Sequence, residues 1–282
     1  MKNPNEKVYI PISEQKISIF AVWTEMFDEI KSSYELIWRL FLRDFIAGYK
    51  QSILGILWVI IMPLIMTSIF IFLNYSGIFN TGQTTVPYPV FSLLGLTIWQ
   101  LFSSGVISCT NSLVISGGLI TKINFPKETL IFSSISQSIL DFIIRFIFLG
   151  IVFVIFRICP SWKIIFLPLF LIPLILFTIG LGFLFSLFNA FIHDISNLVS
   201  LFVTFLLFMT PVLYQQPTSK IYNMFYKLNI PGILIVSTRD IVLTGNISQP
   251  TLFFYSCIIS ILVFVIFWTL FHLVEPIVSE RI

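Results

Sequence analysis

The feature that most constrains this chain is a long stretch without any charged side chain. No Asp, Glu, Lys or Arg occurs between Lys50 and Lys122. Only the segment from Asn74 to Pro89 interrupts it, because Gly, Asn and Pro break helical periodicity there. Each half exceeds the ~20 apolar residues that cross a hydrocarbon core of about 30 Å. The stretch alone therefore predicts two membrane-spanning helices.

The composition extends this conclusion to the whole chain. Of its 282 residues, 57% are hydrophobic and 10% are charged, whereas soluble domains are about 25% charged. Such a composition excludes a cytosolic enzyme, a secreted disulfide scaffold, a disordered chain and a nucleic-acid binder. The apolar runs are long and unbroken, which excludes the short alternating strands of a β-barrel. We expect an all-α, polytopic membrane protein.

Six apolar runs are long enough to cross a membrane. They cover residues 52–75, 88–113, 129–156, 164–191, 195–214 and 251–274. Between the last two, Ile221–Leu228 and Gly232–Leu243 are apolar but too short to cross. We expect two short re-entrant outer helices there, with an ordinary surface loop as the alternative.

The chain divides into a cytoplasmic N-terminal segment, residues 1–50, and a six-span transmembrane domain, residues 51–282. The segment carries seven basic and seven acidic residues. Apolar side chains recur in it at helical spacing within a wedge of roughly 100°. They are Phe20, Trp23, Phe27, Ile30, Tyr34, Ile37 and Phe41. We expect an amphipathic helix in the membrane interface. A soluble helix docked on a partner protein is the alternative.

The distribution of basic residues predicts the orientation. Six spans place both termini on one side of the membrane. Ten Lys and Arg lie on that side and five lie in the opposite loops. The excess of Lys and Arg in cytoplasmic loops then places both termini in the cytoplasm. We expect a multi-pass protein of the bacterial cytoplasmic membrane.

Titratable groups are too sparse for a catalytic site. His193 and His272 have no partner at metal-ligand spacing, and Cys109, Cys159 and Cys257 are scattered. No Gly-rich loop ends in Lys-Ser or Lys-Thr, so no P-loop is present. We therefore expect no enzyme activity, no bound metal and no cofactor in this chain.

Asp141 and Arg145 are the charged pair that lies well inside a span. At a separation of four residues they share a helix face and can neutralise each other. An ionisable group in a span is expensive, and it is a functional candidate by default. Asp141 could be the proton site of an ion-coupled transporter. A structural pair that fixes span 3 against a neighbour is the alternative.

Aromatic residues are abundant, with 32 Phe. Aromatic faces stack on the C–H-rich faces of sugar rings without fixing one sequence of sugars. A path lined by them would suit a long glycan that slides. Contact with lipid or with other helices is the alternative for any single residue, Trp58 and Trp99 included.

Four segments carry motifs in a fixed order. The matching residues are Tyr49, Lys50, Gln51, Leu54, Gly55, Trp58 and Pro63; then Gly95, Trp99 and Phe102; then Leu119, Ile120, Lys122, Phe125 and Pro126; and finally Thr210, Pro211 and Tyr214. With this topology the chain resembles, over residues 35–275, the ABC-2 type membrane subunits that export lipid-linked polysaccharides such as O antigen and teichoic acid.

Two positions depart from the pattern of that family. The family's Arg-Asp pair after span 4 is replaced by His193-Asp194 in this chain. The family's Asn-Pro in the outer loop is interrupted, because Ile230 stands between Asn229 and Pro231.

The resemblance implies the membrane-spanning subunit of an ATP-driven exporter, acting as a homodimer above two cytoplasmic ABC ATPase subunits. ATP and Mg²⁺ would bind to those partners. O antigen is the first expected cargo; capsule glycan, teichoic acid, another lipid or a drug are alternatives, and nucleic acid is not expected. The ATPase-coupling loop would include Gly118, Leu119, Lys122, Phe125, Pro126 and Lys127. Substrate access and the path would involve Arg43, Tyr49, Lys50, Trp58, Trp99, Phe102 and Tyr214.

Overall fold

The computed structural model describes residues 19–50, 52–78, 82, 84, 86–216 and 220–279. Regular structure in this part of the chain is helical throughout, which confirms the all-α prediction. The helices are α1 (Ile19–Ser32), α2 (Tyr34–Lys50), η2 (Gly55–Leu57), α3 (Trp58–Tyr75), α4 (Tyr88–Ile115), α5 (Gly117–Ile120), α6 (Glu128–Ile155), η3 (Trp162–Phe166), α7 (Leu167–Phe191), α8 (Ile195–Met209), α9 (Lys220–Leu228), α10 (Ile230–Leu243) and α11 (Pro250–Ser279). The motif residue Gln51, the first 18 residues of the N-terminal segment and the side chain of Phe20 lie outside the described residues.

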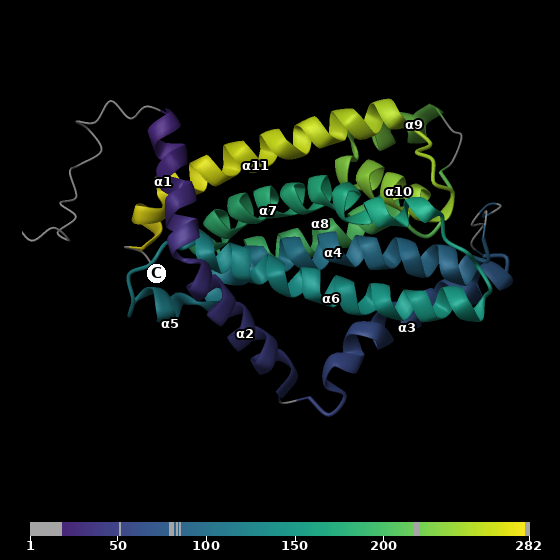
Figure 1. Ribbon diagram of the computed structural model, residues 1–282, viewed down its shortest axis with the longest axis horizontal. Helices are drawn as coiled ribbons and strands as arrows, with labels where there is room; N and C mark the ends of the chain where they lie inside the picture. Colours follow the sequence, from purple (N-terminus) through teal and green to yellow (C-terminus); the bar gives the residue numbers. More distant parts are fainter. Residues whose placement is uncertain are drawn as a thin grey trace, which may run out of the picture.

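Five helical stretches of the described chain are long and apolar enough to cross a membrane. They are Gly55–Tyr75, Tyr88–Ile115, Glu128–Ile155, Trp162–Phe191 and Pro250–Glu275. Figure 1 shows α4, α6, α7 and α11 running along the long axis of the molecule, and α4 packs against α6 and α7 while α7 packs against α11. The protein is therefore a multi-pass membrane protein.

The predicted span over residues 195–214 is not confirmed. α8 ends at Met209 after 15 residues, a rise of about 22 Å at 1.5 Å per residue. This is shorter than a hydrocarbon core of about 30 Å. A residue before proline is pushed out of the helical region, and Thr210, which precedes Pro211, has an extended backbone. Pro211 therefore explains the early end of α8.

Two short helices, α9 and α10, form where the two short apolar pieces were predicted. Asn229 begins α10, because its side-chain oxygen accepts a hydrogen bond from the Gly232 amide at 2.9 Å and Pro231 fills the first turn. Leu234 and Ile235 of α10 are fully buried against the bundle. Their re-entrant placement in a membrane stays a prediction.

The central helix of the bundle is α4. It is the least hydropathic of the five candidate spans and by far the most buried. Two of its buried threonine hydroxyls are satisfied within the helix, since Thr97 donates to the Leu93 carbonyl at 2.8 Å and Thr110 donates to the Val106 carbonyl at 2.7 Å. An apolar helix with several hydroxyl side chains can thus stand in the middle of the bundle without unpaired groups at these two positions.

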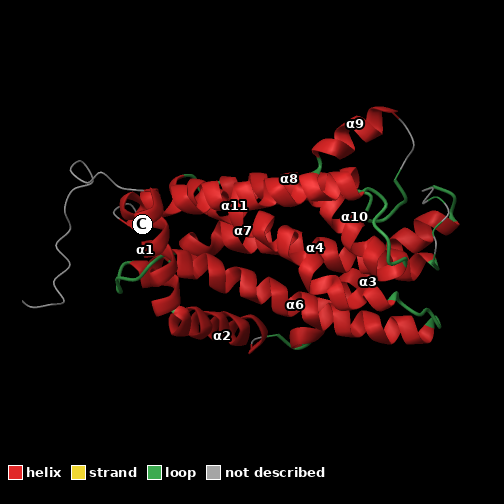
Figure 2. Cartoon of the chain, turned by 45° about the horizontal axis from the view of Figure 1, so that its top comes forward, coloured by secondary structure: helices red, strands yellow, loops and turns green. Residues whose placement is uncertain are grey.

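The N-terminal amphipathic region is two helices, and the prediction of one helix was wrong. α1 and α2 meet at Ser33, and α2 lies beside α6 (Figure 2). Met26 and Leu40 are among its buried side chains, whereas Phe27 and Tyr34 of the predicted wedge are 57% and 71% exposed. The other described members of the wedge, Trp23, Ile30, Ile37 and Phe41, are buried or partly buried, so the wedge marks much of the packed face of the two helices.

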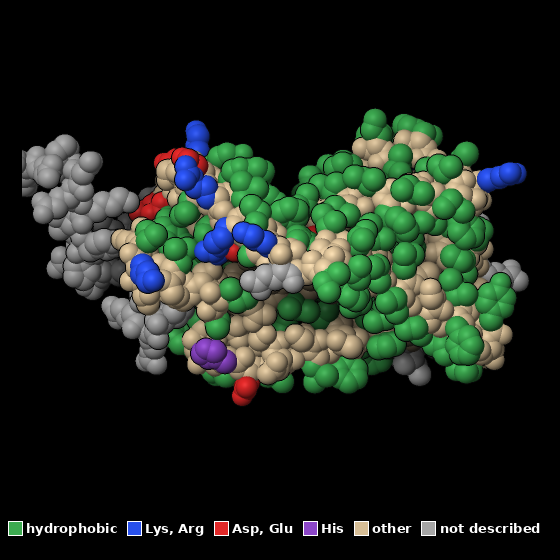
Figure 3. Space-filling model, turned by 90° about the horizontal axis from the view of Figure 1, so that it is seen from below, with side chains coloured by type: hydrophobic (Ala, Val, Ile, Leu, Met, Phe, Trp, Pro, Cys, Tyr) green, Lys and Arg blue, Asp and Glu red, His purple; other side chains and the backbone are tan. Residues whose placement is uncertain are grey.

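The two ends of the bundle differ in character. α1, α5 and the C-terminal end of α11 lie at the same end of the molecule, and α9 lies at the other (Figure 1). On the face drawn in Figure 3, charged side chains gather mainly toward the end that holds α1, and hydrophobic side chains cover most of the rest. We refer to the end that holds α5 as the α5 end.

Candidate functional site

The loop between α4 and α6 has an exposed tip and a buried base. Thr121, Lys122 and Asn124 are exposed. Phe125 is only 8% exposed and belongs to an apolar cluster with residues of α4, α6 and α7. Of the predicted coupling residues, Gly118 and Lys122 therefore face outward, while Phe125 anchors the loop.

The base of this loop is fastened to α11. The Lys127 amide donates to Glu275 Oε1 at 2.9 Å, and the Lys127 ammonium lies 3.4 Å from the same oxygen. The next residue, Glu128, is fully buried and accepts a hydrogen bond from the Trp268 indole at 3.1 Å. His272 Nδ1 lies 3.0 Å from the same carboxylate oxygen. Movement of the loop is therefore tied to movement of α11.

A second polar network joins α2 to α6. The Tyr49 hydroxyl donates to Asp141 Oδ1 at 2.9 Å, and the Gln137 amide donates to the same oxygen at 3.1 Å. Arg145 lies with Nη2 4.0 Å from Asp141 Oδ2 and donates through Nε to the Val59 carbonyl at 3.2 Å. The predicted pair is thus part of a network that reaches both α2 and α3.

The state of Tyr49 follows from its surroundings. Burial raises the pKa of the Tyr49 phenol, and the neighbouring Asp141 carboxylate raises it further. The phenol therefore remains protonated and can donate to Asp141 across the physiological range.

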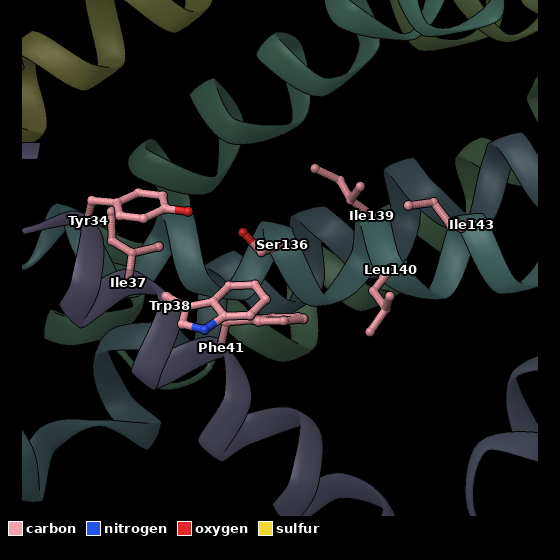
Figure 4. Close-up of a pocket in the computed structure, with 8 residues that line it drawn as sticks. All are labelled: Tyr34, Ile37, Trp38, Phe41, Ser136, Ile139, Leu140 and Ile143. Atoms are coloured by element: carbon pink, nitrogen blue, oxygen red, sulfur yellow. The ribbon is translucent and has the colours of Figure 1, made fainter. Parts of the chain in front are cut away.

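A groove of about 310 Å³ runs between α2 and α6 beside this network. Trp38 and Phe41 of α2 face Leu140 and Ile143 of α6 across it, and Ser136 supplies a hydroxyl (Figure 4). The aromatic rings of α2 continue along the helix to Phe45 and Tyr49, with centroid separations of 6.2 and 5.1 Å. The lining is suited to hydrocarbon rather than to a charged ligand.

The predicted access and path residues fall into two groups. Lys50 and Trp58 are exposed. Arg43 is also exposed, but its guanidinium lies 2.8 Å from Asp44 and is partly neutralised. Trp99 and Phe102 are 4% and 1% exposed, since they pack inside the bundle around α4.

The segment after α8 is held by a buried arginine. Arg239 of α10 donates to the carbonyls of Pro211 and Val212 at 2.9 and 3.2 Å and lies 4.0 Å from the centre of the Phe91 ring. Burial lowers the pKa of Arg239 to about 10. Gly95 allows α4 to pack closely against the segment after α8, because a Cβ at this position would lie 2.5 Å from the Val212 carbonyl oxygen.

Tyr214 completes this segment. Its hydroxyl donates to the Phe208 carbonyl at 2.8 Å, and its ring lies 6.3 Å from that of Tyr222. Two motif residues, Gly95 and Tyr214, thus contact the same non-helical segment between α8 and α9.

Sequence reasoning missed several residues of these networks. Arg239 and Asp240 are adjacent charged residues inside the short apolar piece Gly232–Leu243, and that local signal could have identified Arg239. Glu128 and His272 meet across 144 positions of the chain, and no local pattern indicates such a pairing.

Comparison with known proteins identifies a family and several relatives. Residues 35–243 match the model of the ABC-2 type transporter family. Two O-antigen export system permease proteins RfbA of Klebsiella pneumoniae are each 27% identical, over 73% and 72% of this chain and 79% and 78% of their own length. The protein of the same description from Myxococcus xanthus is 26% identical over 62% of this chain and 66% of its own. The family match covers well over half of the chain, and the chain therefore belongs to the ABC-2 type transporter family.

Proposed function

We propose that this chain is the membrane-spanning subunit of an ATP-driven exporter of a lipid-linked polysaccharide, with O antigen as the first candidate. The observation that carries the proposal is the α4–α6 loop. Its tip is exposed and its base is buried and fastened to α11. A loop built in this way can receive a push from a partner and pass it to the bundle. The names of the relatives support the choice of cargo.

ATP and Mg²⁺ bind to two cytoplasmic ATPase partners in this proposal, and this chain performs no hydrolysis. The α5 end faces those partners, so that both termini are cytoplasmic and the protein resides in the bacterial inner membrane. Closure of the ATPase pair moves the loop, and the loop moves α6 and α11. That movement shifts the population between closed and open pathways.

A second copy of the chain completes the path. α8 leaves a row of large apolar side chains exposed, including Phe202, Phe205 and Phe208, and α3 leaves Trp58 and Met62 exposed. A homodimer that joins these faces would have aromatic rings along its seam, where a glycan could slide. Trp99 and Phe102 are buried within one chain and are left out of this path.

Lys50 is the proposed contact for the pyrophosphate of the carrier lipid, because it is exposed at the end of α2, next to Tyr49. The groove between α2 and α6 offers apolar surface nearby for the hydrocarbon of the carrier. A Lys50→Glu variant should insert normally but export less glycan. Normal export by an inserted variant would remove Lys50 from this role.

The decisive experiment is copurification with the ABC ATPase from the same genome, followed by hydrolysis assays in proteoliposomes. We expect a complex with two copies of each chain, and faster ATP hydrolysis when lipid-linked O antigen is added. If ATP hydrolysis is stimulated instead by capsule glycan, teichoic acid, a simple lipid or a drug, the proposed ATP-driven mechanism stands and the proposed cargo is wrong. Absence of any ATPase partner would contradict the proposal.

An ion-coupled transporter that uses Asp141 is the second candidate. The partly buried position of Asp141 in a span favours this mechanism. Against it, Asp141 Oδ1 already accepts hydrogen bonds from Tyr49 and Gln137, which stabilise the ionised carboxylate. ATP-free vesicles with an imposed proton gradient separate the two mechanisms. Transport there, with its loss in Asp141→Asn, would establish the second candidate.

A further inference from the structure

Three possible metal ligands meet at the α5 end of the bundle, each from a different element. Glu29 belongs to α1, Glu128 is the first residue of α6, and His272 lies near the C-terminal end of α11. One ligand atom from each side chain lies within 4.8 Å of the other two. We propose that Glu29, Glu128 and His272 form a binding site for a divalent transition metal of the zinc class. The inference is independent of the transported cargo.

Glu128 supplies the observation that points to a ligand. Its side chain is fully buried. One carboxylate oxygen, Oε1, accepts from Trp268 and lies 3.0 Å from His272 Nδ1. The other, Oε2, has no hydrogen-bond partner among the described residues. A buried carboxylate oxygen without a donor is costly, and a cation bound there would remove that cost.

The charge around the cluster favours a cation. Three carboxylates, those of Glu29, Glu128 and Glu275, lie close enough to interact with the charge of His272. Lys127 forms an ion pair with Glu275. The negative potential of this group of carboxylates attracts a divalent cation, which would bind beside a neutral His272 imidazole.

The donor set distinguishes between metals. One imidazole nitrogen and two carboxylate oxygens are ligands of zinc and its first-row neighbours, whereas calcium and magnesium take oxygen ligands alone. The thiolates that copper(I) prefers are absent from the cluster. The His272 imidazole must be neutral to bind the metal, so binding weakens as the pH falls.

The surroundings hold the ligands in place. The Trp268 indole fixes Glu128 through its hydrogen bond. The rings of Trp23 and Phe27 of α1 each lie 5.3 Å from that of Trp268, edge to face. Such a shell orients ligands and limits water. A bound metal would link α1, the base of the α4–α6 loop and α11.

The test is zinc titration of the purified full-length chain in detergent, carrying an affinity tag without histidine and the background substitution Cys159→Ser. Cys159 is replaced because its exposed thiol could bind zinc by itself. We expect one zinc per chain, and affinity at least roughly 10-fold weaker in His272→Ala and in Glu29→Gln. His193→Ala is the matched control, since His193 is the second of the two histidines and is exposed. It should bind zinc as the parent does.

Thermal unfolding provides the second measurement. Zinc should raise the unfolding temperature of the parent and of His193→Ala, and at the same zinc concentration it should raise that of His272→Ala by clearly less. Glu128→Gln is informative if it folds, and the other two variants decide the matter if it does not. No zinc binding by the parent, or unchanged affinity in both His272→Ala and Glu29→Gln, would overturn the proposal. Equal losses in His193→Ala and His272→Ala would overturn it as well.

Discussion

The hydroxyl of Tyr49 donates a 2.9 Å hydrogen bond to the carboxylate of Asp141, 92 positions further along the chain. Tyr49 lies in the last turn of α2 and Asp141 lies within α6. A residue of the family's N-terminal motif is thereby joined to the charged pair inside a span. The bond fixes the end of α2 to the bundle.

We expect Tyr49→Phe to destabilise the protein, because it removes a donor from a partly buried carboxylate. The loss should be about 1.5–3 kcal/mol, the usual range for a hydrogen bond to a charged group. Unfolding in one detergent under matched conditions measures it. Tyr75→Phe is the control, since Tyr75 is 90% exposed at the end of α3. Equal stability of the two variants would show that the bond contributes nothing.

Two glycines in spans should respond to alanine in opposite directions. Gly95→Ala places a methyl group 2.5 Å from the Val212 carbonyl oxygen, and forced displacement in a packed interior costs about 1–3 kcal/mol. Gly150→Ala meets no atom within 4 Å and should stabilise α6 by about 0.5–1 kcal/mol. Thermal unfolding of both variants checks the signs. Unchanged stability of Gly95→Ala would contradict the prediction, because it would mean that residues 210–214 can move away from the methyl group without a loss of stability.

Removal of the Arg239 guanidinium should destabilise the segment after α8. Arg239→Met leaves the carbonyls of Pro211 and Val212 without this donor, at a cost of about 1–3 kcal/mol for unsatisfied buried groups. Arg157→Met is the control, because Arg157 is exposed. Faster proteolysis of the 210–216 segment in Arg239→Met, and not in Arg157→Met, would locate the effect.

Mutations at the tip and at the base of the α4–α6 loop should have different effects: one on ATPase binding and the other on stability. Lys122→Glu changes an exposed charge and should weaken ATPase binding while leaving thermal stability within about 0.5 kcal/mol. Phe125→Ala removes a buried ring and should cost about 3–5 kcal/mol of stability. Binding is measured by copurification, and stability by unfolding of the isolated chain. Normal complex formation by Lys122→Glu would argue against contact at the tip.

Much of the fold follows from the sequence, because long apolar runs report directly on helices in lipid. The runs at 88–113 and 129–156 became α4 and α6 with ends shifted by a few residues. The span predicted over residues 195–214 is not confirmed, because the apolar sequence continues past Pro211 while α8 ends at Met209. The apolar stripe over residues 20–41 identified the packed side chains Trp23, Ile30, Ile37 and Phe41, but its periodicity does not show that two helices meet at Ser33.

The candidate site was only partly predictable. The Asp141–Arg145 pair is visible in sequence as two charges four residues apart. Its connection to Tyr49 and Val59 requires the tertiary fold. Trp99 and Phe102 were identified from a motif and assigned to the substrate path. Only the structure shows that both are buried inside one chain.

The burial of α4 bears on how the protein is made. α4 is the least hydropathic of the candidate spans and the most enclosed, yet it leaves the ribosome before α6 and α7, the helices that enclose it. During synthesis its polar side chains must face lipid, or remain in the protein-lined channel that inserts membrane helices, until those partners arrive. Truncation after α4 should therefore yield a fragment that remains in the bilayer through α3 but is removed by quality-control proteases faster than the full chain.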